Sequence, residues 1–253
     1  MTQSTLPKLR LASVVAAALL ALAGTGAHAQ LANGDFSLNG GQGQVTYNTT
    51  LDSWTAGGQE GSGGNPARAP VFVFASSNAG GTVSGDSWFG NVGFYSLSAP
   101  PSGSYFIAAD GDSRLAGSIS QTVNGLTVGH TYDLSFNWAG AQQTGFSGPT
   151  TEKWQVSFGA DTQSTSTVAT PSQSFVGWQN STLSFTAASA SQLLSFLAIG
   201  TPNGQPPWLL LNGLSLTDTT TPPPVPEPST LAMLAVGIAG LVLLRRRSQR
   251  SAE

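Results

Sequence analysis

The sequence of 253 residues contains no cysteine, and charged residues make up only 8% of it. Without cysteine, neither disulfides nor thiolate-ligated metals can hold the fold. Only three basic residues, Arg68, Arg114 and Lys153, lie between residues 30 and 227, against eleven acidic ones, so the net charge of that span is three minus eleven, or −8. This balance excludes nucleic-acid binding by counterion release. An anionic polymer would also be repelled unless a cation bridged it.

The remaining lysine and arginine residues lie at the two ends of the chain. Lys8 and Arg10 precede an apolar run over residues 11–22, and Ala27-His28-Ala29 provides the small-x-small pattern that signal peptidase accepts. We therefore predict a secretory signal peptide over residues 1–29, with cleavage between Ala29 and Gln30. An uncleaved N-terminal anchor is the alternative, which the short run and the cleavage pattern disfavour.

The other end combines an apolar segment with a basic cluster. Residues 229–244 are uncharged and are followed by Arg245, Arg246 and Arg247. As a helix, this segment would rise about 1.5 Å per residue to roughly 24 Å, which is short of the ~30 Å hydrocarbon core. The arginines would remain on the cytoplasmic side. We predict a membrane anchor over residues 229–250, preceded by a linker over residues 219–228, where TTTPPPVPEP favours an extended polyproline II spacer.

The order of these pieces is specific. Pro226, Glu227 and Pro228 precede the apolar segment, and the three arginines follow it. This arrangement resembles the PEP-CTERM sorting signal of Gram-negative bacteria. The resemblance implies processing by an exosortase, a membrane protease-transferase, in bacteria that make exopolysaccharide and biofilm. It also implies an inner-membrane anchor facing the periplasm before processing, and the cell surface or the extracellular space afterwards. A plain C-terminal membrane helix on a proline-rich stalk is the alternative.

The body of the chain, residues 30–218, has the pattern of an all-β protein. Apolar and polar residues alternate over residues 131–138 and 153–158, which is typical of strands with one buried face. Weaker alternation occurs over residues 71–74, 105–108, 118–123, 182–186, 193–199 and 209–216. Turn-forming residues separate these segments. About eight such strands predict a single antiparallel β-sandwich or jelly roll.

Several segments of the body also resemble a known fold. They are residues 31–36, Trp54, the strand pair 118–123 and 132–138, residues 177–178, and the closing strand 207–216. In this order they resemble galactose-binding-like jelly rolls and carbohydrate-binding modules. In those proteins the closing strand often carries an aspartate that contributes to a structural calcium site. Here Asn212 stands at that place, so the carboxylate is missing.

Residues that carry chemistry are few, and none forms a catalytic motif. After signal removal His130 is the only histidine, so zinc sites and Cys-His catalysis are excluded. A lone histidine in a turn is predicted to be structural. Asp110 and Asp112 could offer two oxygens to calcium, although the EF-hand pattern fails and turn capping is the alternative. No other cofactor is indicated. Ser113, in a Gly-Asp-Ser-Arg run, lacks the histidine that a hydrolase serine needs.

The aromatic residues are more informative. The alternation assigns Trp138 and Trp154 to the core. Other rings lie among Gly, Ser and Asn residues, where they could stack on sugar rings while polar neighbours bind hydroxyl groups. The predicted carbohydrate-binding residues are Trp54, Trp88, Tyr95 and Trp178. The alternative is that these rings cap the ends of the sandwich.

These observations predict an exported, non-enzymatic β-sandwich at the cell surface or in the matrix that binds exopolysaccharide. A structural matrix or adhesion protein without a small ligand is one alternative. A glycan hydrolase is another, because eleven acidic residues cannot exclude a catalytic pair by counting.

Overall fold

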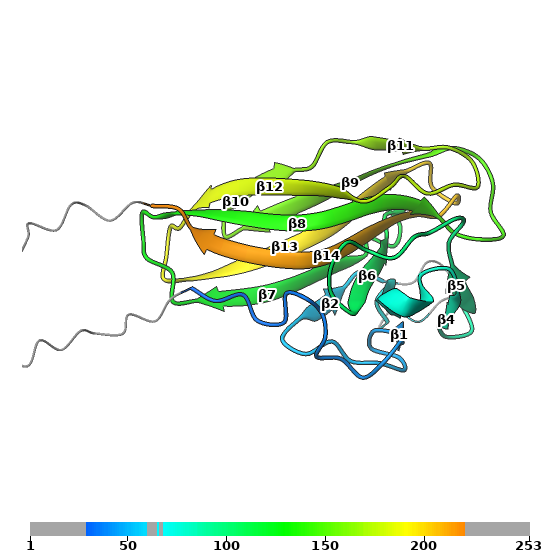
Figure 1. The fold of residues 1–253 in the computed structure, drawn as a ribbon, viewed down its shortest axis with the longest axis horizontal. Coiled ribbons are helices and arrows are strands. Elements are labelled where there is room, and N and C mark those ends of the chain that lie inside the picture. Colours follow the sequence, from blue (N-terminus) through cyan, green and yellow to red (C-terminus); the bar gives the residue numbers. More distant parts are fainter. Residues whose placement is uncertain (1–28, 60–64, 66–67, 221–253) are drawn as a thin grey trace, which may run out of the picture.

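The computed structural model describes residues 29–59, 65 and 68–220, which form two antiparallel β-sheets packed face to face and one small hairpin (Figure 1). The predicted signal peptide and its cleavage site up to His28, the sorting motif and the predicted anchor lie outside the described residues. The described residues include no helix that is long and apolar enough to span a membrane.

The first sheet contains six strands. In spatial order they are β1 (Gly43–Gln44), β3 (Val71–Ala75), β6 (Tyr105–Asp110), β14 (Pro207–Asp218), β8 (Thr131–Gln142) and β12 (Gln179–Thr186). Every pair in it is antiparallel. β14 lies between β6 and β8, so strands distant in sequence form the centre of this sheet.

The second sheet contains five strands in its main path, with one short strand attached. In order they are β10 (Asp161–Ser164), β9 (Thr150–Phe158), β13 (Ser191–Thr201), β7 (Ser118–Asn124) and β2 (Thr55–Gly57), and β11 (Val168–Thr170) also pairs with β9. The separate hairpin consists of β4 (Thr82–Ser84) and β5 (Asn91–Gly93). A single short 3₁₀ turn, η1 (Ser76–Asn78), precedes it.

The β-sandwich prediction is confirmed, and each of the eight predicted segments lies within an observed strand. The observed strands extend further: β8 continues to Gln142, and β12 begins at Gln179. The predicted core positions Trp138 and Trp154 are both fully buried. The short strands β1, β2, β4, β5, β10 and β11 were not predicted, because two to four residues are too few to show a period of two.

The first sheet is buried on both faces along β3, β6 and the first half of β14, whereas β12 and the first half of β8 have one more exposed face. Leu209 and Leu211 of β14 face the interior of the sandwich, whereas Trp208 and Leu210 face outward into a second apolar cluster. This explains the unbroken apolar run in β14, since a strand buried on both faces need not alternate. We call the second cluster the outer core. It comprises Phe72, Phe74, Ala79, Val83, Val92, Phe94, Leu97, Phe106, Ala108, Ala139, Ala141, Trp208 and Leu210.

The segment that covers the outer core runs from η1 through the β4–β5 hairpin (Figure 1). Aromatic rings interlock there: Phe72 and Phe94 each meet the Trp208 ring edge to face, with centroids 5.6 and 5.5 Å apart. Such contacts add to the burial of apolar area. The hairpin is therefore held on the sheet by side-chain packing.

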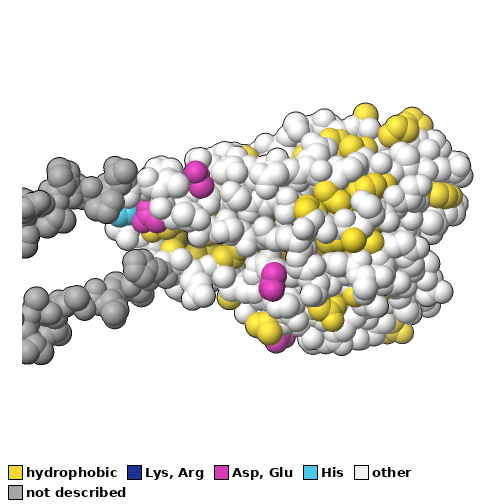
Figure 2. All heavy atoms as spheres, in the orientation of Figure 1, with side chains coloured by type: hydrophobic (Ala, Val, Ile, Leu, Met, Phe, Trp, Pro, Cys, Tyr) yellow, Lys and Arg dark blue, Asp and Glu magenta, His cyan; other side chains and the backbone are white. Residues whose placement is uncertain are grey.

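The long central strands define two ends of the molecule. In the β8–β14 pair, Pro207 lies opposite Gln142 at one end, and Asp218 lies opposite Tyr132 at the other. Twelve residues per strand at about 3.3 Å each separate these ends by roughly 40 Å. The described chain begins and ends at the Asp218 end (Figure 1), which we call the exit end. Figure 2 shows that this view of the surface is largely uncharged, with a few acidic side chains.

Candidate ligand-binding site

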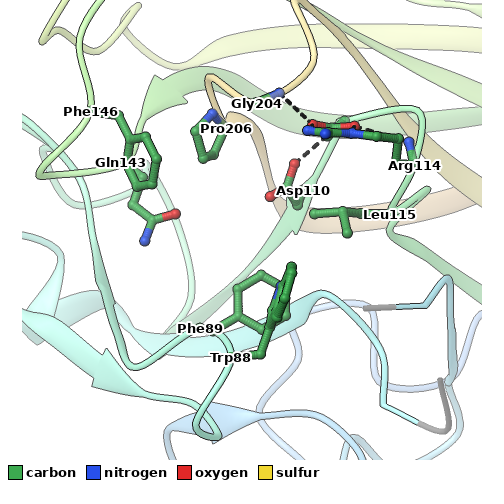
Figure 3. Close-up of a pocket in the computed structure, with 10 residues that line it drawn as sticks. Trp88, Phe89, Asp110, Arg114, Leu115, Gln143, Phe146, Gly204 and Pro206 are labelled. Carbon is green, nitrogen blue, oxygen red and sulfur yellow. Dashed lines mark hydrogen bonds and ion pairs between the residues drawn. The ribbon is translucent and has the colours of Figure 1, made fainter. Parts of the chain in front are cut away.

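A cavity of about 410 Å³ opens at the end of the sandwich opposite the exit end. Four segments contribute to it: the β4–β5 loop, the residues where β6 ends, the β8–β9 loop and the β13–β14 loop (Figure 3). We call it the end cavity. Its lining residues are Trp88, Phe89, Asp110, Asp112, Arg114, Leu115, Gln143, Phe146, Gly204 and Pro206.

The sheet geometry explains why polar groups lie here. Side chains two apart on a strand share a face, so Asp110 follows Phe106 and Ala108 on the outer face of β6. Gln143 likewise follows Ala141 just beyond β8. The outer core therefore continues into the end cavity, with an acid and an amide where the earlier positions are apolar.

A tight turn places the acidic groups beside each other. Gly111 donates its N–H to the Pro207 carbonyl at 2.8 Å and accepts from Gly200 N–H at 2.7 Å. A Cβ on Gly111 would lie 2.9 Å from both backbones, so the position requires glycine. The chain can thus bend immediately after Asp110 and bring Asp112 back to the cavity.

Hydrogen-bond donors occupy all acceptor positions of the Asp112 carboxylate. Its Oδ1 accepts from the backbone N–H and the Nε of Arg114, both at 2.9 Å. Its Oδ2 accepts from Arg114 Nη2 and from Gly204 N–H, the latter at 2.6 Å. Burial opposes ionisation of Asp112, but these hydrogen bonds prevail and hold its pKa below the usual value. The ion pair ties the residues after β6 to the β13–β14 loop.

Asp110 has a different environment. Its side chain is 1% exposed, and Oδ1 accepts the backbone N–H of Asp112 at 2.9 Å. Burial raises its pKa to about 7, with the hydrogen bond from Asp112 acting in the opposite direction. Two carboxyl groups in one cavity therefore differ in protonation near neutral pH.

The loop that carries Trp88 is rigidly supported. Asp86 Oδ1 accepts the N–H groups of Trp88 and Phe89 at 2.9 and 3.3 Å. Its Oδ2 pairs with Arg68 at 2.8 Å, and that guanidinium lies 4.1 Å from the centre of the Tyr47 ring. The Trp88 side chain is nevertheless 43% exposed, so the loop presents an aromatic face to solvent.

The opposite wall is positioned by Trp208 and by Tyr95. The Trp208 indole N–H donates to Gln143 Oε1 at 3.0 Å, which fixes the side-chain amide. The Tyr95 hydroxyl accepts the N–H of Gly145 at 3.1 Å, next to Phe146. Phe146 is 39% exposed. Together these contacts hold an open aromatic ring and an amide at the cavity.

The four predicted carbohydrate-binding residues do not lie on one surface. Only Trp88 lines the end cavity. Trp54 is 6% exposed and packs against Phe36 and Phe196 in the sandwich core, so it is not part of an exposed binding face. That part of the prediction is corrected by burial.

The other two predicted residues have supporting contacts. Tyr95 lies behind the β8–β9 loop, as its hydrogen bond to Gly145 shows. Trp178 is half-buried on the outer core, where its ring meets Phe106 edge to face with centroids 5.7 Å apart. Its indole N–H donates to the Ser98 carbonyl at 3.0 Å. These contacts match the alternative interpretation, in which the rings cap the sandwich.

The structure also brings together residues that were predicted separately. Trp88 was predicted to bind sugar, and Asp110 and Asp112 were predicted to bind calcium. All three residues line the same cavity. Phe146 and Gln143 were not predicted as candidates from the sequence. The sequence does contain a signal for Phe146, because this aromatic residue lies in a segment rich in Gly, Ser and Pro, as Trp88 lies among small and polar residues. Gln143 had none, because its position depends on the register of β8.

The residues present do not fit the predicted calcium site. Every acceptor position of Asp112 is used by a donor, and Arg114 lies where a cation would bind. Asn212 is committed as well, because it accepts from Ser102 and donates to Tyr105. No group of three or more acidic or histidine residues with metal-binding geometry occurs among residues 29–59, 65 and 68–220.

A further buried carboxyl group lies inside the sandwich. Glu152 of β9 is fully buried and accepts hydrogen bonds from the hydroxyl groups of Thr150 and Thr170. Burial raises its pKa to about 7, with the two hydroxyl groups acting to lower it. The alternation that places Trp154 inward also places Glu152 inward.

The exit end has simpler chemistry. His130 Nδ1 lies 2.7 Å from Asp218 Oδ2, in keeping with the structural role predicted for this histidine. The Thr219 N–H donates to the Thr131 carbonyl at 2.9 Å, and the Thr131 N–H donates to the Thr220 hydroxyl at 2.7 Å. These bonds attach the start of the predicted linker to β8.

Comparison with solved structures finds proteins that are similar in part. TmCBM61 in complex with β-1,4-galactotriose has 16% identity and a TM-score of 0.41, covering 76% of this chain and 99% of that one. The CBM22-1 xylan-binding domain from Paenibacillus barcinonensis Xyn10C has 15% identity and a TM-score of 0.36, with coverages of 68% and 90%. The N-terminal cellulose-binding domain of Cellulomonas fimi β-1,4-glucanase C has 14% identity and a TM-score of 0.30, with coverages of 67% and 91%.

Comparison at the level of sequence is informative only for the tail. No curated protein matches this chain. One family model, described as the PEP-CTERM protein-sorting motif, matches residues 224–247. This confirms the resemblance drawn from Pro226, Glu227, Pro228 and the arginine cluster. The chain therefore carries a PEP-CTERM sorting motif, which indicates export.

Proposed function

We propose that this exported protein binds a carbohydrate in the end cavity and works as a non-enzymatic module at the cell surface or in the matrix. The observation that carries the proposal is the pairing of open aromatic rings with fixed polar groups. Trp88 and Phe146 are exposed at the cavity, while Asp110 and Gln143 are buried beside them. Apolar faces of sugar rings stack on aromatic rings, and their hydroxyl groups need fixed hydrogen-bonding partners.

The size and rigidity of the cavity support the same function. Its volume of about 410 Å³ falls within the ~300–1,000 Å³ of small-molecule sites. Its walls are held by the ion pair of Asp112 with Arg114 and by the hydrogen bond from Trp208 to Gln143. Preformed walls reduce the entropy lost when a ligand binds. A sugar residue can therefore enter without rearrangement of the sheet.

The position of the cavity suits a tethered protein. The sorting motif follows the exit end, whereas the end cavity lies at the far end of β8 and β14. While residues 229–250 hold the chain at the inner membrane, the cavity points away from the tether. An exosortase-type enzyme is the proposed processing partner, and exopolysaccharide is the proposed ligand source after release to the surface.

A glycan-binding measurement tests this function. The full chain in mild detergent is applied to an array of bacterial polysaccharides and oligosaccharides, and hits are measured by calorimetry. Trp88→Ala is expected to weaken binding by about ten- to a hundredfold, as loss of a stacking ring costs about 1–3 kcal/mol. The control Leu193→Ala, which removes an exposed apolar side chain of β13, leaves binding unchanged. Absence of binding to every glycan removes the proposal in favour of a matrix protein without a small ligand.

One observation favours a second candidate, glycan hydrolysis. Asp110 and Asp112 share the cavity, and their environments move their pKa values in opposite directions, which is a feature of acid and base pairs. Against this, all acceptor positions of Asp112 are occupied. Turnover of a labelled polysaccharide by the wild-type chain, lost in Asp110→Asn, would establish the hydrolase.

A further inference from the structure

The charges of the end cavity do not cancel. Arg114 pairs with Asp112 through two of its nitrogens, so this acid and this base neutralise each other. Asp110 lies on the same cavity with no cation of its own: its Oδ1 accepts a backbone N–H, and its Oδ2 meets no donor among the described residues. The lining therefore carries a surplus carboxyl group, on a residue that is 1% exposed.

The surroundings of Asp110 define what would satisfy it. A buried carboxylate needs a donor, and a charged donor gives the stronger bond. Trp88, Phe89 and Phe146 contribute aromatic rings to the same cavity, and the face of an aromatic ring attracts an ammonium group. A carboxylate beside aromatic rings is the combination that recognises an amine (Figure 3). A neutral sugar would use the rings but would offer the Asp110 carboxyl group no cation.

We infer that the end cavity selects sugars that carry a free amino group, the 2-amino-2-deoxyhexose class, with Asp110 receiving the ammonium and Trp88 stacking on the ring. This inference rests on the proposed function and specifies its ligand class. The charge of the whole body agrees with it. Residues 30–218 contain ten acidic and three basic residues, so a cationic polymer is attracted over distances beyond contact.

Arg114 does not reverse this preference. Its side chain is exposed, and a guanidinium alone would favour the carboxylate of a uronic acid. Here its Nε and Nη2 both donate to Asp112, and a carboxylate ligand would also face Asp110. Binding of a uronic acid would place three carboxyl groups around one guanidinium, which like-charge repulsion disfavours.

Calorimetry with matched probes tests the inference. The full chain at pH 7 is titrated with tetrasaccharides of β-1,4-linked glucosamine, N-acetylglucosamine, glucose and galacturonic acid. The glucosamine probe is expected to bind at least about tenfold more tightly than the glucose probe, because the charged pair is made only with the amine. The preference is expected to shrink in 0.5 M salt, since added ions screen it.

Two variants assign the preference to one residue. Asp110→Asn keeps the shape of the side chain and removes its charge, so the preference for the glucosamine probe over the glucose probe is expected to fall to less than about twofold. Asp161→Asn removes an exposed acid of β10 and keeps the full preference. The ellipticity and melting curve of each variant verify that it is folded.

The outcomes separate the two proposals. Binding of glucose or galacturonic acid probes at least as tight as that of glucosamine overturns the amine inference and leaves carbohydrate binding in place. A glucosamine preference that survives Asp110→Asn also overturns the inference, because the amine would then be recognised elsewhere. Failure of all four probes and of the wider array overturns carbohydrate binding itself.

Discussion

The two ends of the sandwich differ in what they bury and what they expose. At the end cavity, Asp110 is buried and Trp88 is exposed. At the exit end, the hydrogen-bonded pair His130 and Asp218 is partly exposed, and the neighbouring contacts are hydrogen bonds between threonines and the backbone. Burying polar groups and exposing apolar ones both cost free energy of folding.

This difference indicates where a function would lie. An arrangement that costs stability persists when the surrounding structure supports it, and such arrangements concentrate at functional sites. The ion pair of Asp112 with Arg114 and the capped Trp88 turn provide that support at one end only. The exit end needs no more than a firm attachment for the predicted linker, and its contacts at Thr219 and Thr220 provide that.

The largest expected effect is on stability at the cavity end. Trp208→Ala removes a fully buried ring that contacts three phenylalanines and orients Gln143. The free energy of unfolding is expected to fall by about 3–5 kcal/mol, as measured in urea. A loss below about 1 kcal/mol would show that the outer core is not a true core.

The next effect is a pH dependence with opposite signs at the two ends. Asp110 and Glu152 have raised pKa values of about 7, so between about pH 4 and 7 the folded state holds protons that the unfolded state has released. The stability is therefore full below about pH 4, declines as pH rises from about 4 to about 7 and levels off above that, with a total loss on the order of a few kcal/mol. Thermal melting from pH 5 to pH 8 measures it.

The variants sharpen this test. Asp112 and Arg114 face Asp110, and their pair stays charged over this range, so the fall in stability with pH is assigned to Asp110 and Glu152. The double variant Asp110→Asn, Glu152→Gln is expected to have a melting temperature that changes little between pH 5 and pH 8. The pKa of Asp218 is lowered by the hydrogen bond from His130, so its contribution has the other sign and is lost as pH falls below about 4. A melting temperature that rises steadily from pH 5 to pH 8 would contradict this assignment.

The third effect distinguishes the two outer tryptophans. Trp178→Ala is expected to cost about 1–3 kcal/mol of stability, because its half-buried ring packs on Phe106. Oligosaccharide affinity stays within about twofold, since no cavity wall is removed. Trp88→Ala is expected to have the converse effect, a loss of oligosaccharide affinity with little change in stability. Loss of affinity in Trp178→Ala at a matched folded fraction would extend the site along the outer core.

The smallest effect is expected at the exit end. Breaking the exposed pair with His130→Asn is expected to change stability by less than about 0.5 kcal/mol. A change above about 2 kcal/mol would mean that the attachment of the linker is part of the cooperative core. Urea unfolding of the variant beside wild type measures the difference.

The sequence predicts the strands well because their signal is local. Residues 131–138 show the alternation of β8 directly, and Trp138 is buried as that pattern requires. The outer core could not be predicted in the same way. Whether Phe72 faces solvent or a second cluster depends on the β4–β5 hairpin, whose strands are three residues each and whose docking is a long-range contact.

The candidate site was predicted in pieces. Trp88 was identified from its polar neighbours, and Asp110 from the turn that follows its strand. Their proximity depends on the register of β6 with β14, where Asp110 lies opposite Trp208. Trp54 has equally polar neighbours in sequence but is buried by Phe36 and Phe196. Local composition thus indicates an exposed ring only when no distant segment covers it.

Photo-crosslinking locates the ligand most directly. A glucosamine tetrasaccharide with a diazirine at its reducing end is bound to the full chain, irradiated and mapped by mass spectrometry of the labelled peptides. Carbohydrate binding in the end cavity predicts label on the peptides that carry Trp88, Arg114 or Phe146, competed by unlabelled sugar. Competable label on the peptides that carry His130 or Asp218, with none at the cavity, would contradict it.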